Sequence, residues 1–371
     1  MRSPDAGTGP RFVHDTLASR VVFGAARART SLAEEVDHLD ARRVMVIATD
    51  QGRALAEELV AGLGDRVVAT FHGVRPHVPL EVAEAARARA DDAEVDLLLS
   101  VGGGSTTGTA KAVALTSGRP ILAIPTTYAG SEVTPVWGLT EDGAKSTGVD
   151  PVVLPRTVIY DAELTLTLPA GLSAASGLNA LAHAVEAFWA PGRTPISSAV
   201  AEASIRALST GLPGVVDDGS DVVARGEMLL GAWLAGAAFA TAGSGLHHKI
   251  CHVLGGMYDL PHAETHAIVL PHVLAFNAPD APEAAARIAR SLDVEDAGAG
   301  LVALARRVGA PGGLHEGGLR EDQLDAAVDP VLTKVPGDNP RPADRAAIAA
   351  LLHRAWSGPP STAAATQGAS T

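Results

Sequence analysis

The residues most able to do chemistry in this sequence are histidines, and they cluster. The segment SGLHHKICHVLGGMYDLPHAETHAIVLPH contains six of them: His247, His248, His252, His262, His266 and His272. His248 and His252 are four residues apart, as are Asn179 and His183 upstream, which places each pair on one face of a helix. His262 follows a proline and is expected in a loop. A single histidine on an apolar helix is more often a core residue, but this convergence predicts a metal site or an acid–base cluster.

A glycine-rich loop is the second candidate feature. The segment LLLSVGGGSTTGTAKA places Gly102, Gly103, Gly104 and Ser105 between an expected buried strand and a helix. Glycines let backbone N–H groups approach a phosphate, and a helix N-terminus adds partial positive charge. The pattern is neither GxGxxG nor a P-loop, because no GK[ST] follows. Taken alone, the loop is interpreted equally well as a tight turn that needs positive φ.

Polar residues also follow two other expected strands. Thr126 and Thr127 come directly after one strand, in PTTYAGSEVT, and Asp50 comes just after another. Because the carboxyl ends of parallel strands meet at one edge of a sheet, we expect these residues to face the same crevice as the glycine loop. Asp50 could accept a hydrogen bond from a ribose hydroxyl there, although a surface turn explains it equally well.

These motifs need a scaffold, and the sequence from Arg42 to Pro125 predicts a parallel sheet covered by helices. Short apolar runs typical of buried strands alternate there with amphipathic segments. The expected strands are 44–48, 67–71, 96–101 and 121–125, and the expected helices are 54–63, 80–90 and 107–116. A hairpin is expected around 137–145, and 158–164 is expected to be the last strand.

The second half of the sequence predicts helices alone. After Leu168 and Pro169 the strand patterns end, and alanine-rich helical periods continue to Trp356. We therefore expect an α/β nucleotide-binding domain over 10–166 and an all-helical catalytic domain over 167–356, with a cofactor cleft between them. Residues 1–9 and 357–371 are small and polar, and both ends are expected to be disordered.

Charge and composition exclude several partners. The net charge is −13, so an acidic surface would repel nucleic acid and anionic membranes. The single cysteine, Cys251, excludes an intramolecular disulfide and fits a reducing compartment. The sequence has no apolar run typical of a signal peptide, and no stretch approaches the ~20 apolar residues of a membrane span. We expect a cytoplasmic protein.

In order and spacing, four motifs resemble those of iron-containing alcohol dehydrogenases: the glycine loop, PTTxxxGSEVT, the helix GLNALAHAVEA and the segment H-xxx-H-x9-H. NPRP at 339–342 also resembles their ending, so the similarity runs from about 12 to 356. The resemblance implies their fold, a dinucleotide-binding N-terminal domain with an all-helical C-terminal domain like that of dehydroquinate synthase. It also implies a homodimer.

Site residues are implied by the same resemblance. NADH or NADPH would contact Asp50, Gly102, Gly103, Gly104, Ser105, Thr126 and Thr127. A metal position would be built by Asn179, His183, His248 and His262. His252 would lie beside the nicotinamide and the substrate without ligating metal, and Lys145 would also face the cleft.

Two residues depart from the metal-dependent pattern of the family. Asn179 stands where the family usually has Asp, and His77, assigned to the cofactor side of the cleft, stands where it usually has Asn. Both departures, and the stretch 127–148, resemble maleylacetate reductases. Those enzymes reduce maleylacetate to 3-oxoadipate in bacterial catabolism of aromatic compounds, and many are considered independent of added metal. The resemblance therefore puts a bound iron or zinc ion in doubt.

A mechanism follows from that substrate, which is a dianion with a ketone conjugated to a C=C bond. Hydride added to the carbon β to the ketone would leave negative charge on the ketone oxygen, which nearby donors would stabilise. Asn179 and the histidines would supply those donors in place of a metal. Lys145 ranks first as a carboxylate partner, with Lys249 and Arg156 more readily explained as exposed charges. The proton donor is left open between a histidine and water.

Two alternatives remain at this stage. A metal-dependent alcohol or aldehyde oxidoreductase is compatible with the motifs, because an Asn carbonyl oxygen can ligate metal. A lyase like dehydroquinate synthase shares the architecture, but the missing carboxylate at Asn179 argues against its zinc site. The choice between NADH and NADPH is open, although Asp50 would repel a 2′-phosphate.

Overall fold

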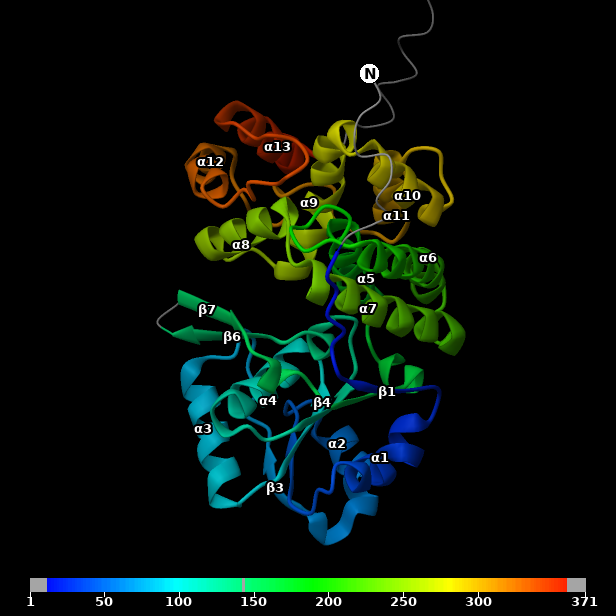
Figure 1. The fold of residues 1–371 in the computed structure, drawn as a ribbon, viewed down its shortest axis with the longest axis vertical. Coiled ribbons are helices and arrows are strands. Elements are labelled where there is room, and N and C mark those ends of the chain that lie inside the picture. The colour runs from blue at the N-terminus through cyan, green and yellow to red at the C-terminus, as the bar shows by residue number, and fades with distance from the viewer. Residues whose placement is uncertain (1–11, 142–143, 359–371) are drawn as a thin grey trace, which may run out of the picture.

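The structure, a computed structural model, describes residues 12–141 and 144–358. A part built on a sheet lies beside a part built of helices (Figure 1). The last short helix of the sheet part ends at Thr165, and the first helix of the other part begins at Ala170. The disorder expected for 1–9 and for 359–371 lies outside the described residues, whereas Ser357 ends a helix.

A six-stranded sheet forms the centre of the N-terminal part, and the parallel α/β architecture is confirmed. Its strand order is β1-β8-β5-β4-β2-β3, with every pairing parallel. The strands are β1 (Arg20–Phe23), β2 (Val44–Ile47), β3 (Val67–Phe71), β4 (Leu97–Gly102), β5 (Ile121–Pro125) and β8 (Thr157–Tyr160). The helices are α1 (Arg27–His38), α2 (Arg53–Val60), α3 (Leu80–Asp92) and α4 (Gly104–Ser117). The inner strands are buried almost throughout, which is why their sequences are continuous apolar runs.

Several boundaries differ from the sequence-based expectations. The last strand, β8, ends at Tyr160 instead of 164, because the Asp161 side chain accepts from the backbone N–H of Glu163 and starts a 3-10 turn. The helix expected from 107 begins at Gly104, directly after the glycine loop. The expected hairpin forms from β6 (Val136–Glu141) and β7 (Ala144–Val149).

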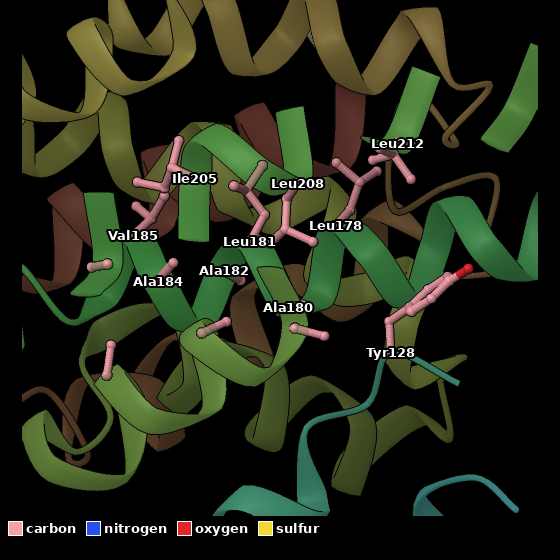
Figure 2. Packing of buried hydrophobic residues seen from close by; sticks show 14 of the residues in the cluster. Tyr128, Leu178, Ala180, Leu181, Ala182, Ala184, Val185, Ile205, Leu208 and Leu212 are labelled. Carbon is pink, nitrogen blue, oxygen red and sulfur yellow. The ribbon is translucent and has the colours of Figure 1, made fainter. Parts of the chain in front are cut away.

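The C-terminal part contains helices alone among the described residues. They are α5 (Ala170–Glu186), α6 (Pro195–Asp217), α7 (Val222–Ala242), α8 (Leu246–Tyr258), α9 (His262–Asn277), α10 (Pro282–Leu292), α11 (Ala297–Arg307), α12 (Leu324–Leu332) and α13 (Arg345–Ser357), with short 3-10 turns. Figure 2 shows Leu178, Leu181 and Val185 of α5 beside Ile205 and Leu208 of α6 in the largest core. Each such buried side chain stabilises the domain by roughly 1.5–3 kcal/mol. This packing fixes α5, which carries Asn179 and His183.

One expectation about membranes needs correction. Helix α7 is 21 residues long and apolar enough, by length and composition, to cross a membrane. Half of its apolar window is buried inside the protein, where it packs against α5 and α6.

A buried arginine joins the two parts of the molecule. The guanidinium of Arg225, on α7, donates to the Tyr128 hydroxyl at 3.0 Å and to Ser173 Oγ at 2.8 Å. It also donates to the carbonyl oxygens of Leu168 and Gly219, each at 3.0 Å. Tyr128 belongs to the loop after β5, so this network holds that loop against the helical part.

Candidate active site

The two polar loops meet at the carboxyl edge of the sheet, as predicted. Gly102 ends β4 with φ of +151°, and a Cβ there would lie 2.5 Å from Thr106 Oγ1. A Cβ on Gly103 would lie 3.0 Å from Thr127 Cγ2, and the backbone N–H of Thr126 donates to the Gly102 carbonyl at 3.1 Å. Gly103 is the N-cap residue of α4 and provides no side-chain cap, so the first N–H groups of the helix are available to a phosphate. Cofactor binding by these residues stays a prediction.

Asp50 and His77 also lie after strands of this sheet, and both are exposed. Asp50 follows β2, the neighbour of β4, and pairs with Arg53 at 2.7 Å. His77 has φ of +62°, and its carbonyl oxygen accepts from Thr140 Oγ1 at 2.8 Å. The hairpin therefore fixes the backbone of His77, which is exposed to solvent.

The three candidate cations are placed differently. The backbone of Lys145 lies in β7, and its side chain is outside the described part of the structure. Lys249 is half-buried on α8, and its Nζ donates to Ser244 Oγ at 3.0 Å. Arg156 is exposed at the amino end of β8, where its backbone N–H donates to Ile121 at the start of β5. Arg156 is the exposed charge that the sequence favoured, and it lies at the edge of the sheet opposite the glycine loop.

The predicted histidines do converge, from three helices. Helix α5 supplies His183, α8 supplies His247, His248 and His252, and α9 supplies His262 and His266. The rings of His183 and His248 stack with centroids 4.9 Å apart, and those of His248 and His252 are 6.0 Å apart. The His262 and His266 centroids are 4.4 Å apart. His262 is the first residue of α9, not a loop residue. His272, also on α9, lies apart from this cluster and faces a small pocket that α11 also lines.

Five buried polar atoms in and beside this cluster have no hydrogen-bond partner. They are Asn179 Oδ1, His183 Nδ1, His247 Nδ1, His248 Nε2 and His266 Nε2. Asn179 is 7% exposed and lies one helical turn before His183 on α5. Because a buried polar atom without a partner is costly, such a set indicates a place where a ligand or water completes the hydrogen bonding.

A buried carboxylate, Glu186, orients the cluster, and the sequence interpretation assigned it no role. Glu186 is fully buried at the end of α5, and its Oε2 lies 2.5 Å from His248 Nδ1. The carboxylate also accepts from the backbone N–H groups of Gly245 at 3.0 Å and His247 at 2.6 Å. Glu186 is part of the motif GLNALAHAVEA, and a charged residue in so apolar a helix is itself a signal, since buried Glu is nearly always paired.

Burial keeps these imidazoles neutral. It lowers the pKa of His183, His248 and His266 well below the usual histidine value, and neighbouring histidines lower the pKa further. Burial also lowers the pKa of His247 to about 3, although the Glu186 carboxylate opposes this. At neutral pH these four rings therefore act as hydrogen-bonding groups and not as fixed cations.

The position at which the resemblance implies a metal is lined by the Asn179 amide and by imidazoles that burial keeps neutral. Three imidazoles can hold zinc when their nitrogens converge. Among the residues that the structure describes, however, the group whose ligand atoms lie within 4.8 Å of one another is His247, Cys251 and His266. Within that group, His247 Nε2 and His266 Nδ1 are already hydrogen-bonded at 2.9 Å. With Asn179 in place of a carboxylate, the implied position offers neutral donors alone.

Comparisons with known proteins agree with the motifs and the geometry. Residues 18–162 match the family model of iron-containing alcohol dehydrogenases, and residues 173–356 match its C-terminal model. Maleylacetate reductases of Sphingobium indicum and Burkholderia cepacia are 48% and 47% identical, with 95% and 94% of this chain and 100% and 98% of theirs aligned.

Solved structures give the same result. The maleylacetate reductase of Agrobacterium tumefaciens is 45% identical, with a TM-score of 0.91 over 94% of this chain and 99% of that one. An iron-containing alcohol dehydrogenase of Corynebacterium glutamicum is 50% identical, with a TM-score of 0.91 over 94% and 98%. The resemblance drawn from the motifs is confirmed: the chain is an oxidoreductase that belongs to the iron-containing alcohol dehydrogenase family.

Proposed function

We propose that this enzyme reduces the C=C bond of maleylacetate to give 3-oxoadipate, with NADH or NADPH as the reductant. The observation that carries the proposal is Asn179, whose buried and unpartnered Oδ1 replaces a metal-binding carboxylate beside neutral histidines. Near-complete alignment with maleylacetate reductases at 48% and 47% identity supports the same substrate.

The residues of the pocket would act on the ketone. When bound, the nicotinamide supplies the hydride for the carbon β to the ketone. Negative charge then develops on the ketone oxygen, and the unpartnered polar groups of Asn179 and His183 would supply the hydrogen bonds to it. The Asn179 amide can present either its oxygen or its NH2 group, so it can donate to that oxygen. No step needs a metal in this scheme.

We propose that either cofactor is accepted. Arg53 pairs with the Asp50 carboxylate at 2.7 Å, so the charge expected to repel a 2′-phosphate is compensated locally. Both members of this pair are exposed, so salt weakens the pairing. Steady-state kinetics with each cofactor measure the preference. A homodimer and a cytoplasmic location stay predictions from the family resemblance.

The test is a comparison of substrates after treatment with a chelator. NADH and NADPH oxidation is followed with maleylacetate and with a panel of small aldehydes, and NAD+ reduction with small alcohols. We expect turnover of maleylacetate that excess chelator leaves unchanged. Turnover of simple alcohols or aldehydes without any on maleylacetate would overturn the proposal. The family assignment would survive that result.

One observation favours the metal-dependent alternative. The soft ligand set of His247, Cys251 and His266 lies close enough to hold an ion if the hydrogen bond between the two rings opens. Activity lost to chelator and restored by zinc or iron would support this alternative. A Cys251→Ser variant would then decide whether this group holds the ion.

A further inference from the structure

The Glu186 carboxylate joins two helices of the active site. Glu186 is the last residue of α5, three residues after His183, and it is fully buried. It accepts hydrogen bonds from three donors at the start of α8, the backbone N–H groups of Gly245, His247 and His248, at 3.0, 2.6 and 3.4 Å. One carboxylate therefore sets where α8 begins relative to α5.

The same carboxylate decides how the His248 ring is turned. His248 Nδ1 lies 2.5 Å from Glu186 Oε2, so the ring carries its proton at Nδ1 and donates it in a hydrogen bond to the carboxylate. The other ring nitrogen, Nε2, is buried and unpartnered, beside the equally unpartnered Nδ1 of His183. With Nδ1 occupied, Nε2 is the one ring nitrogen of His248 left for a ligand.

The space around the carboxylate is closed by a glycine. A Cβ on Gly245 would lie 2.8 Å from Glu186 Oε1, nearer than a carbon can approach without displacing it. The backbone of Gly245 has φ of −102° and ψ of −158°, a conformation open to any residue. Contact with the carboxylate, and not backbone conformation, is therefore the reason for glycine at this position.

We propose that Glu186 is a positioning residue for the reduction, which fixes the His248 ring so that Nε2 faces the substrate. The identity of that substrate rests on the function proposed above, whereas the orientation of the ring does not. A purely structural role, as a cap for α8, would affect stability and leave turnover unchanged. The two roles are therefore separable by experiment.

The first experiment compares Glu186→Gln with Asp161→Asn. Gln has one oxygen, so it can serve either the His248 ring or the His247 N–H, and its NH2 group opposes the other donor. We expect kcat to fall by about 10- to 100-fold, the range found for carboxylates that orient metal-ligating histidines, with the KM for the cofactor little changed. Asp161 is the matched control, because it is also a buried carboxylate that caps backbone N–H groups, those of Ala26, Ala28 and Glu163. Asp161→Asn should lower the Tm and keep kcat.

A second variant covers the case in which Glu186→Gln does not fold. Gly245→Ala keeps the carboxylate and displaces it, so kcat should again fall. An NMR measurement on 15N-histidine-labelled wild-type protein does not depend on either of these variants. It should show a strongly hydrogen-bonded, slowly exchanging Nδ1 proton on one histidine, assigned to His248 by its loss in His248→Gln. Absence of that proton, or wild-type kcat in either folded variant, would overturn the proposal.

The two proposals fail in distinguishable ways. If the wild-type enzyme reduces another carbonyl compound and not maleylacetate, the proposed substrate is wrong. The kcat ratio of Glu186→Gln to wild type is then measured on the compound that is reduced. If maleylacetate is the substrate and the variant is fully active, the proposed substrate stands and the role of Glu186 is wrong.

Discussion

The substitution Asn179→Asp introduces a carboxylate into this pocket and tests whether the pocket is suited to a neutral group or to a metal-binding charge. Asn179 is 7% exposed and its Oδ1 has no partner, so a carboxylate there would be buried and uncompensated. Leaving such a charge unpaired costs roughly 3–5 kcal/mol. The metal-free variant should therefore be less stable than the wild type at pH 7.5 by about 3 kcal/mol, with a Tm lower by several degrees.

A divalent ion should reverse that loss in the variant alone. Binding at a free concentration of 100 times the Kd returns about 2.7 kcal/mol, close to the expected deficit. The assay is thermal unfolding of chelator-treated wild type and variant, with and without zinc or ferrous iron, together with the KM for maleylacetate. That KM should rise in the variant, because a carboxylate repels a dianion.

Asn277→Asp is the matched control for this experiment. Asn277 is also a buried amide in the helical part, where it pairs with Asn339 at 2.8 Å, on the opposite end of α9 from His262. Its variant should lose stability that metal does not restore. The reasoning is refuted if metal raises the Tm of the wild type as much as that of Asn179→Asp. It is equally refuted if wild-type activity disappears with chelator and returns with metal.

Two other predictions use features outside the histidine cluster. Gly104→Ala puts a Cβ 3.3 Å from the Ala129 Cβ in the predicted phosphate loop, so cofactor affinity should fall about tenfold (~1.4 kcal/mol) with an unchanged or higher Tm. A fluorescence titration measures the affinity, and Gly62→Ala, with open space around its Cβ, is the control. Equal affinities of the two variants would contradict the cofactor assignment. Burial lowers the pKa of His272 to about 4, below its unfolded value of 6.5. Between these pH values the unfolded chain therefore binds more protons than the folded protein. The contribution of neutral His272 to the free energy of unfolding is fully present above pH 6.5 and decreases by about 3 kcal/mol as the pH falls to 4. His272→Gln should flatten the change in Tm between pH 7.5 and 4.5, and an unaltered slope would exclude His272 as its source.

The central strands of the sheet were predictable because a strand that is buried on both faces has a continuous apolar sequence. The runs at 44–48 and 121–125 correspond to β2 and β5, which are buried at every residue. The edge was not predictable in the same way. Strand β1 has four residues and is half-exposed, so its alternation is too short to recognise. The buried face of α1 includes the charged residue Glu35, which pairs with Arg20 at 2.8 Å. This charge interrupts the apolar pattern by which the helix would be recognised in the sequence.

Some residues of the candidate site were likewise recognisable from local sequence, and others were not. Pairs of residues four apart on one helix, such as His248 and His252, are visible in a sequence because their spacing alone puts them on one face. Glu186 acts on residues some 60 positions away, and nothing local to α5 reveals that partner. What was visible was a lone acidic residue in an apolar helix, which is a sufficient reason to ask what neutralises it.

The charges of the pocket suggest how an acidic chain accepts an anionic substrate. The overall net charge of −13 opposes a dianion at long range, but screening limits that repulsion to about 10 Å in ordinary buffer. Within that distance, the buried carboxylate of Glu186 is turned away from Nε2 of His248 and is held by three backbone N–H groups at the start of α8. Lys249, one residue after His248, adds a cation to the same helix. In the function proposed above, Asn179 stands where the family resemblance expects an Asp, so no carboxylate would face the substrate from that position, while the carboxylate of Glu186 faces the protein.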